Sequence, residues 1–170
     1  MKLRFFSLIL SCACLCLVQG CDKDDSGNDG KSVEDITVTG ATGYTKTVLE
    51  AGMPLWPDDY ANVVEVLGAY FDGFEILISE KGVHPGGVII PEHDGLVYIL
   101  SSVSVLPDGW TSVSGNSVGY TPAGAAQPAS INIYSKLAYA GRPVPIPVVS
   151  GDMAVYPLGR HINYVPGKGQ

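Results

Sequence analysis

The sequence predicts an all-β fold, in which residues 36–170 form one antiparallel β-sandwich domain behind a removable leader and a flexible tether. Two observations predict it. Beyond Ile36 the apolar residues fall in short blocks, which glycine, proline, asparagine or aspartate separates about every ten residues. Several blocks also alternate apolar and polar side chains, as in the run from Ile131 to Tyr134, and this is the period of a strand with one buried face.

The chain opens with a secretory signal pattern. Lys2 and Arg4 provide a positive start, and an almost unbroken apolar run extends from Phe5 to Val18. A membrane-spanning helix needs about 20 apolar residues, whereas this run is shorter and ends before an acidic segment. We therefore expect residues 1–20 to be removed as a lipoprotein signal peptide.

The residues around the expected cleavage site resemble a lipobox. Val18 places an aliphatic side chain three residues before Cys21, and Gly20 places a small residue directly before it. The resemblance implies diacylglycerol on the Cys21 sulfur and an acyl chain on its amino group. Two or more chains hold a protein stably on a membrane, because each buried methylene contributes about 0.8 kcal/mol. A soluble secreted protein with an unmodified Cys21 is the alternative.

The remaining cysteines and the net charge exclude two other classes of protein. Cys12, Cys14 and Cys16 all lie in the leader, so no disulfide is available to the mature domain and a packed core must stabilise it. Loss of Lys2 and Arg4 with the leader changes the net charge from -7 to -9. Because the sequence has no basic patch, nucleic acid is not an expected partner.

Residues 21–35 are predicted to be the lipidated cysteine and an acidic flexible tether. The segment after Cys21 contains six acids and one aliphatic residue, so it cannot bury enough apolar surface to offset its ordering entropy. The order of Lys23 before Asp24 and Asp25 resembles the export signal of surface-exposed lipoproteins in the Bacteroidota. This implies an outer-membrane protein on the cell surface, whereas a generic solvated linker is compatible with the periplasmic face.

Ten strands are expected within an Ig-like or jelly-roll-like sandwich. They are residues 45–49, 62–67, 74–79, 87–90, 96–101, 117–121, 130–136, 144–148, 153–156 and 162–165. Apolar residues between Tyr60 and Phe71 also recur at helical spacing, but the β-branched residues among them favour a strand followed by at most one short helical turn. The alternating prolines at 143, 145 and 147 predict an edge strand or an extended surface segment.

Four aromatic residues are candidate ligand-binding residues: Trp56, Trp110, Tyr120 and Tyr139. Both tryptophans follow proline-containing, loop-like segments, where exposure would let their rings form an apolar platform for a sugar. Burial in the core is the alternative, because large aromatic side chains dominate core packing.

The sequence supports a catalytic site less well than a binding site. Gly115 to Gly119 matches the nucleophile-elbow string around Ser117, and Asp152 and His161 follow in the order that α/β-hydrolases use. The elbow needs a helix directly after it, and Pro122 and Gly124 disfavour one. We therefore predict that the protein is not an enzyme.

Two further sets of polar residues are interpreted as turn residues. His84 and the run Glu92, His93 and Asp94 contain ligand types for a divalent metal, but their spacing does not bring them together, so neither a metal nor another cofactor is expected. The acids at 58, 59, 94 and 108 could be paired carboxylates of a glycosidase, and turn or cap roles are the alternative.

Beyond residue 59 the chain resembles small β-sandwich modules of Bacteroidota outer-surface proteins, alone or attached to polysaccharide-degrading enzymes. The resembling segments are residues 63–74, 95–100, 107–110, 133–136, 140–141 and 145–147. The resemblance implies non-catalytic, glycan-binding or accessory work in polysaccharide use. The membrane, through Cys21, and a polysaccharide or an outer-membrane protein are then the expected partners. A structural protein that binds a partner chain at a strand edge is the alternative, and a small serine hydrolase is a third possibility.

Overall fold

The fold was read from a computed structural model that describes residues 33–34, 36–68, 70–122, 124–127 and 129–161. Within these ranges the chain is all β, which confirms the predicted fold class. The strands are β1 (Val33–Glu34), β2 (Val38–Thr39), β3 (Thr45–Val48), β4 (Pro54–Trp56), β5 (Asp59–Leu67), β6 (Glu75–Ile78), β7 (Val88–Ile89), β8 (Gly95–Ser101), β9 (Thr111–Tyr120), β10 (Ala129–Ala138), β11 (Val144–Pro145), β12 (Val155–Leu158) and β13 (Arg160–His161).

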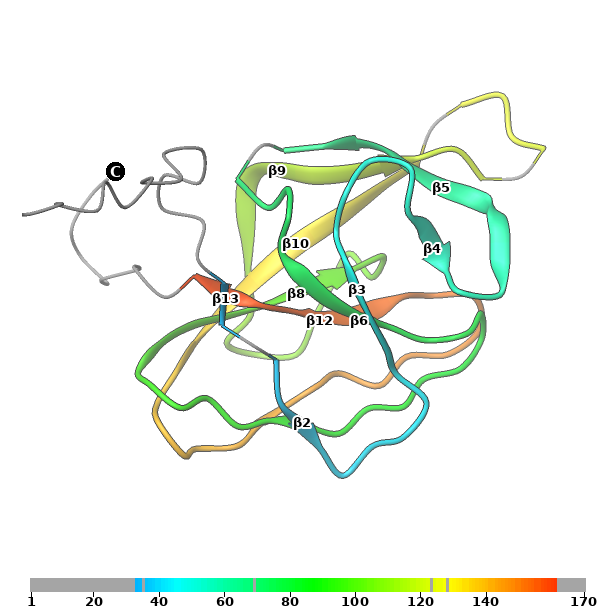
Figure 1. The fold of residues 1–170 in the computed structure, drawn as a ribbon. Coiled ribbons are helices and arrows are strands. Elements are labelled where there is room, and N and C mark those ends of the chain that lie inside the picture. Colours follow the sequence, from blue (N-terminus) through cyan, green and yellow to red (C-terminus); the bar gives the residue numbers. More distant parts are fainter. Residues whose placement is uncertain (1–32, 35, 69, 123, 128, 162–170) are drawn as a thin grey trace, which may run out of the picture.

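The main layer is an eight-stranded antiparallel sheet in the order β3-β6-β12-β8-β10-β9-β5-β4. Its two edge strands, β3 and β4, are consecutive in the chain and only residues 49–53 join them. The sheet therefore curls until its edges approach, with β5 and β9 lying above β12 and β8 (Figure 1). Backbone hydrogen bonds hold the connection at both ends, from Leu49 N to Phe74 O at 2.8 Å and from Gly52 N to Val64 O at 2.7 Å.

A second layer covers one face of the central strands. It is a three-stranded sheet in the order β11-β7-β2, and β2 lies below β12 in Figure 1. The side chains of Ile89 and Val144 in this sheet pack with Ile99 of β8, Tyr134 of β10 and Val155 of β12. The arrangement is thus a sandwich in which one of the two sheets is strongly curled.

The central strands are buried on both faces, and their side chains alternate between two apolar clusters. On β8, Tyr98 and Leu100 point into the interior of the curled sheet, whereas Val97 and Ile99 point toward the small sheet. The first cluster is the larger and includes Phe71, Phe74, Ile76, Ile131 and Tyr156. Burial on both sides explains why residues 97–100 form a continuous apolar run rather than an alternating one.

Most of the expected strands are present, with shifted ends. The strand expected at 117–121 begins six residues earlier as β9, and the strand expected at 153–156 is displaced by two residues as β12. Residues 38–39, which lie outside the expected strands, form β2, and residues 54–56, which were expected to be loop-like, form β4. The strand expected at 162–165 lies outside the described residues.

Two ambiguous segments are resolved by hydrogen bonding. The segment with helical spacing is a strand, β5, and is followed by tight turns in which Phe71 N bonds Gly68 O and Phe74 N bonds Phe71 O. The expected helical turn is therefore not a helix among the described residues. The edge strand predicted for the segment with prolines 143, 145 and 147 is confirmed, because β11 is an edge strand of the small sheet.

The described part of the chain begins with a short strand. Val33 and Glu34, which lie in the segment expected to be the tether, form β1 and pair with His161 and Arg160 of β13. Val33 has a high β propensity, and β13 is a strand that the sequence does not mark. The predicted leader and Cys21 lie outside the described residues.

Candidate functional site

The four candidate aromatic residues do not form one surface. Trp56 and Tyr120 meet at one end of β9, where their rings make an edge-to-face contact at 6.2 Å. Trp110 directly precedes the other end of β9, and Tyr139 follows the strand end of β10 that pairs there. Nine residues of extended chain separate the two ends, or about 30 Å at 3.3 Å per residue.

Of the two positions considered for Trp56, an exposed loop and the core, the structure shows the core. Trp56 lies on β4 and is only 4% exposed, because its ring belongs to the cluster inside the curled sheet. Tyr120 is half-buried against the same cluster. Neither ring can offer a free face to a ligand, since the apolar interactions of the core already cover most of each.

Trp110 and Tyr139 are more accessible but are not joined into a platform. Trp110 is half-buried against the cluster beneath the small sheet, and the Lys136 ammonium lies 5.9 Å from its ring centroid. The same ammonium donates to the carbonyl oxygen of Asp108 at 3.2 Å. Tyr139 is 55% exposed, and nothing places its ring against that of Trp110.

The most highly connected polar cluster surrounds Lys81, and we call it the Lys81 corner. It consists of Trp56, Asp58, Asp59, Asn62, Lys81 and Asp152. The two-residue turn between β4 and β5 supplies Asp58, and Lys81 comes from the turn after β6. Asp152 comes from the turn before β12. Three segments distant in sequence therefore converge on one ammonium group.

Asp59 is held by three donors. The Lys81 Nζ lies 3.0 Å from its Oδ2, Asn62 Nδ2 donates to the same oxygen at 2.6 Å, and the Ala61 backbone N donates to Oδ1 at 3.1 Å. The hydrogen bond from Lys81 is the main cause of a lowered pKa at Asp59, and it raises the pKa of Lys81 in return. Both side chains are therefore charged at neutral pH.

Lys81 is fixed from several sides at once. Its backbone N donates to Asp58 Oδ1 at 2.9 Å, its Nζ lies 3.9 Å from Asp152 Oδ2, and the same Nζ is 5.1 Å from the Trp56 ring centroid. A lysine at the surface normally loses side-chain entropy when it is held in one geometry. Several simultaneous contacts offset that loss, so the carboxylates of the corner have defined positions.

Two neighbouring loops frame the corner. His84 Nε2 lies 2.8 Å from the carbonyl oxygen of Gly151, and a Cβ at Gly86 would be 3.1 Å from Val148 Cγ2, so the loops after β6 and before β12 are in contact. Val83 and Met153 on these loops are large apolar side chains that remain exposed. The polar corner is thus bordered by apolar surface.

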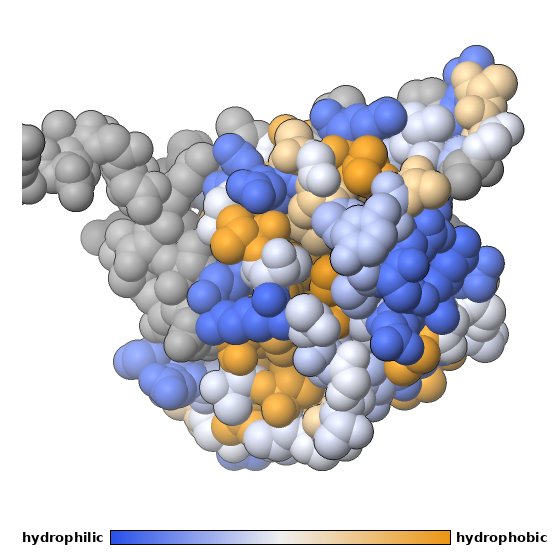
Figure 2. Space-filling view, turned by 45° about the vertical axis from the view of Figure 1, so that its right-hand side comes forward, coloured by the Kyte–Doolittle hydropathy of each residue, from blue (hydrophilic) through white to orange (hydrophobic). Residues whose placement is uncertain are grey.

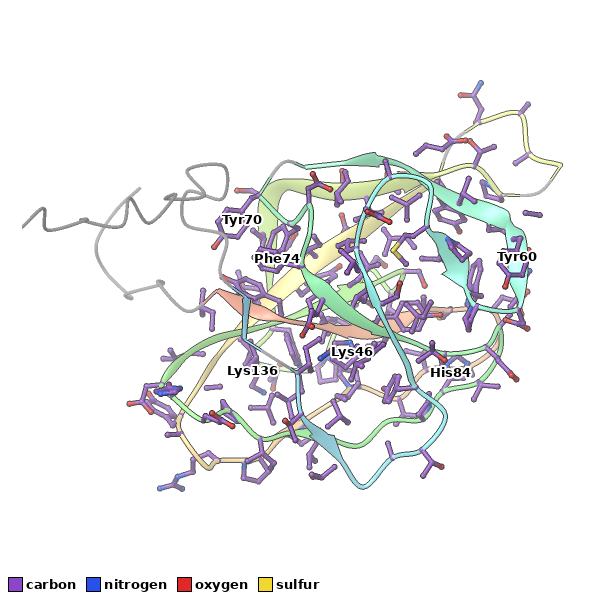
Figure 3. All side chains as sticks on the ribbon, in the orientation of Figure 1. Lys46, Tyr60, Tyr70, Phe74, His84 and Lys136 are labelled. Carbon is purple, nitrogen blue, oxygen red and sulfur yellow. The ribbon has the colours of Figure 1, made fainter. Side chains whose placement is uncertain are left out.

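One widely exposed aromatic residue comes directly after Asp59 in the sequence. Tyr60 follows Asp59 on β5 and is 76% exposed, and it lies on the same side of the molecule as His84 (Figure 3). Strongly hydrophilic residues gather on the right-hand side of the face in Figure 2, next to smaller apolar areas.

Sequence reasoning considered Asp58 and Asp59 but missed Tyr60, Asn62 and Lys81. Both acids bind Lys81: Asp58 accepts from the Lys81 backbone N, and Asp59 pairs with the Lys81 ammonium. Asp94 accepts from the Ala140 backbone N at 2.8 Å, which fits the turn role that was the alternative for these acids. The Pro57-Asp58 turn between two apolar runs was a signal for a hairpin, but nothing in the sequence connects it with Lys81.

The nucleophile elbow is absent from the described segment that contains its string. Residues 115–119 lie inside the continuous strand β9, and Asn132 of β10 pairs with Ser117. A strand that continues through the serine cannot make the sharp strand-to-helix turn that exposes a nucleophile. Asp152, the expected triad acid, instead lies in the Lys81 corner.

The candidate metal-ligating residues also lie apart. Within the described ranges, no three histidine, cysteine, aspartate or glutamate side chains come close enough to hold a metal ion. His84 contacts a backbone carbonyl and Asp94 a backbone amide, so each has a structural role in joining loops.

Comparison with known proteins assigns the chain to no family. No protein-family model matches the chain, and no curated protein matches it. Among solved structures, a beta-glucuronidase from glycoside hydrolase family 2 aligns with 73% of this chain at 14% identity and a TM-score of 0.49. The aligned region is 14% of that protein's length. In the part of the chain that the structure describes, we found no helix of the length and apolarity that crossing a membrane would require.

Proposed function

We propose that this chain is a lipid-anchored, non-catalytic protein of the outer membrane whose β-sandwich domain binds carbohydrate at the Lys81 corner. The observation that carries the proposal is the fixed ion pair of Asp59 with Lys81, directly before the widely exposed Tyr60 on β5. An aromatic face can pack on the C–H groups of a sugar, and carboxylate and ammonium groups can bond its hydroxyls.

The position of the first described residues supports a Lys81 corner that faces away from the membrane. Val33 pairs with His161 of β13, and β13 lies on the left of the domain in Figure 1. Tyr60 and His84 lie on the right in Figure 3, which has the same orientation. A tether from Cys21 to β1 would therefore attach the domain at the side away from the Lys81 corner and leave the corner open to ligands outside the membrane.

The alternative, binding of a partner chain by strand addition, is less favoured by the edges of the sheets. Each edge strand is short: β3 has four residues, β4 three, and β2 and β11 two each. Pro54 begins β4 and Pro145 ends β11, and neither can donate a ladder hydrogen bond. Short, proline-containing edges are ones that resist pairing with another chain.

The carbohydrate proposal is tested by passing neutral and charged polysaccharides over the immobilised protein. Retention of at least one is expected, and Tyr60→Ala should weaken it about tenfold, because truncation of a contact aromatic costs more than about 1 kcal/mol. Tyr139→Ala is the matched control, because Tyr139 is also exposed but follows β10, at the strand end opposite to the one near Trp56.

Two results would contradict the proposal. One is that no polysaccharide is retained, and the other is that both tyrosine variants weaken retention equally. Thermal unfolding of both variants shows whether they are folded. The anchor is tested separately by mass spectrometry of the membrane fraction, where Cys21 should be the mature amino terminus and carry acyl chains, and Cys21→Ser should release the protein from the membrane.

A further inference from the structure

We propose that Asp108 and Gly109 form a site of spontaneous isoaspartate formation, and that Lys136 promotes the reaction. The inference does not depend on the proposed carbohydrate function. It follows from a comparison of three Asp-Gly pairs that the fold holds in different ways.

The residue types alone give the three pairs similar reactivity. Asp72, Asp94 and Asp108 are all exposed, and a glycine follows each of them. Because glycine has no Cβ, its amide nitrogen approaches the carboxyl carbon of the preceding aspartate with little steric hindrance. A fourth pair, Asp29 and Gly30, lies outside the described residues. A difference among the three described pairs must therefore come from the folded structure.

The reaction joins the amide nitrogen of the glycine to the side chain of the aspartate. The nitrogen loses its proton and bonds to Cγ, one carboxyl oxygen leaves as water, and a five-membered imide forms. Water then adds to one of the two imide carbonyls and breaks the bond between that carbon and the nitrogen. Opening at Cγ restores aspartate, whereas opening at the main-chain carbonyl leaves the backbone running through Cγ as isoaspartate. Water is the only co-reactant, and nothing is oxidised or reduced.

In two of the pairs, a hydrogen bond already holds one of the reacting groups. Gly73 N donates to Leu49 O at 2.9 Å, so this nitrogen must leave a backbone hydrogen bond before it can react. Asp94 Oδ1 accepts from Ala140 N at 2.8 Å, and Gly95 is buried as the first residue of β8. Each of these contacts opposes closure of the imide ring, because it has to be broken first.

The third pair is held only at an atom that assists the reaction. The Lys136 ammonium donates to the main-chain oxygen of Asp108 at 3.2 Å, and a Cβ at Gly109 would lie 3.0 Å from Lys136 Cε. Among the described residues, we found no hydrogen-bond partner for the Gly109 N or for the Asp108 carboxylate. The oxygen that Lys136 contacts belongs to the same peptide group as the Gly109 N. When this nitrogen loses its proton, the negative charge is shared with that oxygen, where the cation already lies.

Lys136 also favours the isoaspartate product. Opening of the imide at the main-chain carbonyl converts this group of Asp108 into a free carboxylate, at the position that the ammonium contacts. A charged acceptor then replaces a neutral one, and the hydrogen bond becomes stronger. The backbone between Asp108 and Gly109 becomes longer by one methylene, directly before Trp110 and the start of β9.

The test incubates the full-length protein in detergent at neutral pH, in water enriched with heavy oxygen. Each passage through the imide incorporates one heavy oxygen atom, and methyl transfer by an isoaspartate-specific methyltransferase identifies the isomer. Cleavage at aromatic residues places the three pairs on different peptides for mass spectrometry. Incorporation at Asp108 should exceed that at Asp72 about fivefold, which corresponds to one net hydrogen bond.

Two variants and a matched control test the residues. Lys136→Met should slow incorporation at Asp108 about threefold, as expected for one charged contact at an exposed position, and should leave Asp72 unchanged. The control is Lys46→Met, because Lys46 is also an exposed lysine but pairs with Glu75. Asp108→Glu should remove the signal at this position, since glutamate would have to close a six-membered ring. Thermal unfolding shows whether the variants are folded.

Three results would overturn the proposal. The first is incorporation at Asp108 that does not exceed that at Asp72 and Asp94. The second is a preference for Asp108 that persists in concentrated urea, where we expect the three rates to become equal, because neighbouring residues and not the fold would then set it. The third is an equal rate at Asp108 in Lys136→Met and Lys46→Met, which would exclude the role of the Lys136 ammonium.

Discussion

The two faces of the central strands each carry a tryptophan with a lysine over its ring, and the two pairs are built differently. Trp56 is buried inside the curled sheet, and its partner Lys81 is tied to Asp59 and lies near Asp152. Trp110 is half-buried beneath the small sheet, and its partner Lys136 donates to the backbone carbonyl of Asp108.

The difference shows that a lysine near a tryptophan is not in itself a candidate site. The ammonium-to-centroid distances are similar, 5.1 and 5.9 Å, but only Lys81 gathers carboxylates from other segments of the chain. Lys136 also lies against Gly109, where a Cβ would be 3.0 Å from its Cε, so it closes a turn onto its own strand. The pair of Trp56 and Lys81 brings carboxylates from several segments together, whereas the pair of Trp110 and Lys136 holds one loop in place.

Replacement of each tryptophan should give the largest difference between the two faces. Trp56→Ala is expected to lower the free energy of unfolding by about 3–5 kcal/mol, because it removes a nearly fully buried ring and leaves a cavity. Trp110→Ala should cost about half as much, since part of its ring is already in water. Urea unfolding of both variants measures this, and equal losses would mean that the two faces contribute alike.

Gly87 tests how tightly the small sheet is packed. Its φ is +89°, and a Cβ there would lie 2.7 Å from the carbonyl oxygen of Thr39 and 2.8 Å from Ala41 Cβ. Gly87→Ala should therefore cost about 2–4 kcal/mol, from left-handed backbone strain and from overpacking against β2. Gly124→Ala is the control, because its φ is +77° with nothing within 4 Å of the new Cβ, and it should show the strain alone, about 1–2 kcal/mol.

Each face also buries part of a tyrosine whose hydroxyl donates to a backbone carbonyl. Burial raises the pKa of Tyr44 to about 12, from 10.0, and its hydroxyl bonds Gly86 O at 3.1 Å. Because the folded pKa is the higher one, this contribution to stability is fully present below pH 10 and is lost as pH rises through about 12. Burial also raises the pKa of Tyr156, whose hydroxyl donates to Ser79 O.

The free energy of unfolding should therefore fall less between pH 10 and 12 in Tyr44→Phe than in the wild type. We expect the difference to be about 1 kcal/mol, after solvent screening of a partly exposed group. Thermal unfolding across this range, compared with the wild-type protein, measures the change. The same dependence in Tyr44→Phe as in the wild type would show that Tyr44 is not protected in the fold.

The smallest expected effect is a difference between variants of Lys81 and Lys136 in how stability depends on pH in the acid range. The pKa of Asp59 is lowered mainly by the hydrogen bond from Lys81, so its contribution is present above the unfolded pKa near 3.8 and is lost as pH falls through the lower folded value. Lys81→Met should remove that part of the acid dependence, whereas Lys136→Met should retain it. Unfolding midpoints between pH 2 and 5 measure the difference, and identical profiles for the two variants would remove the distinction between the pairs.

The strands were largely predictable because the signals for them are local. Blocks such as those in β8 and β10 carry the right residue types in extended runs, and the prolines around Val144 marked an edge. The ends were less predictable, since Thr111 to Asn116 joins β9 only because β10 offers a partner there. The strand that contains Trp56 was missed for the same reason, because it has three residues and exists through pairing with β5.

The candidate site was only partly predictable. Sequence reasoning singled out Trp56 and the neighbouring acids, but it left the position of the ring open between the surface and the core, and it left Lys81 unnoticed. Lys81 lies 22 residues from Asp59, and Asp152 is far beyond both. No pattern among neighbouring residues indicates a contact between segments that are so far apart in the sequence.

The amino-acid sequence by itself determined the all-β class, the positions of most strands and an interior without disulfides, because these depend on the identity and order of neighbouring side chains. Only the tertiary structure decided which rings are buried and which charges meet. Burial and ion pairing depend on distances between segments, and those distances are set by how the eight-stranded sheet curls and which loops it brings together.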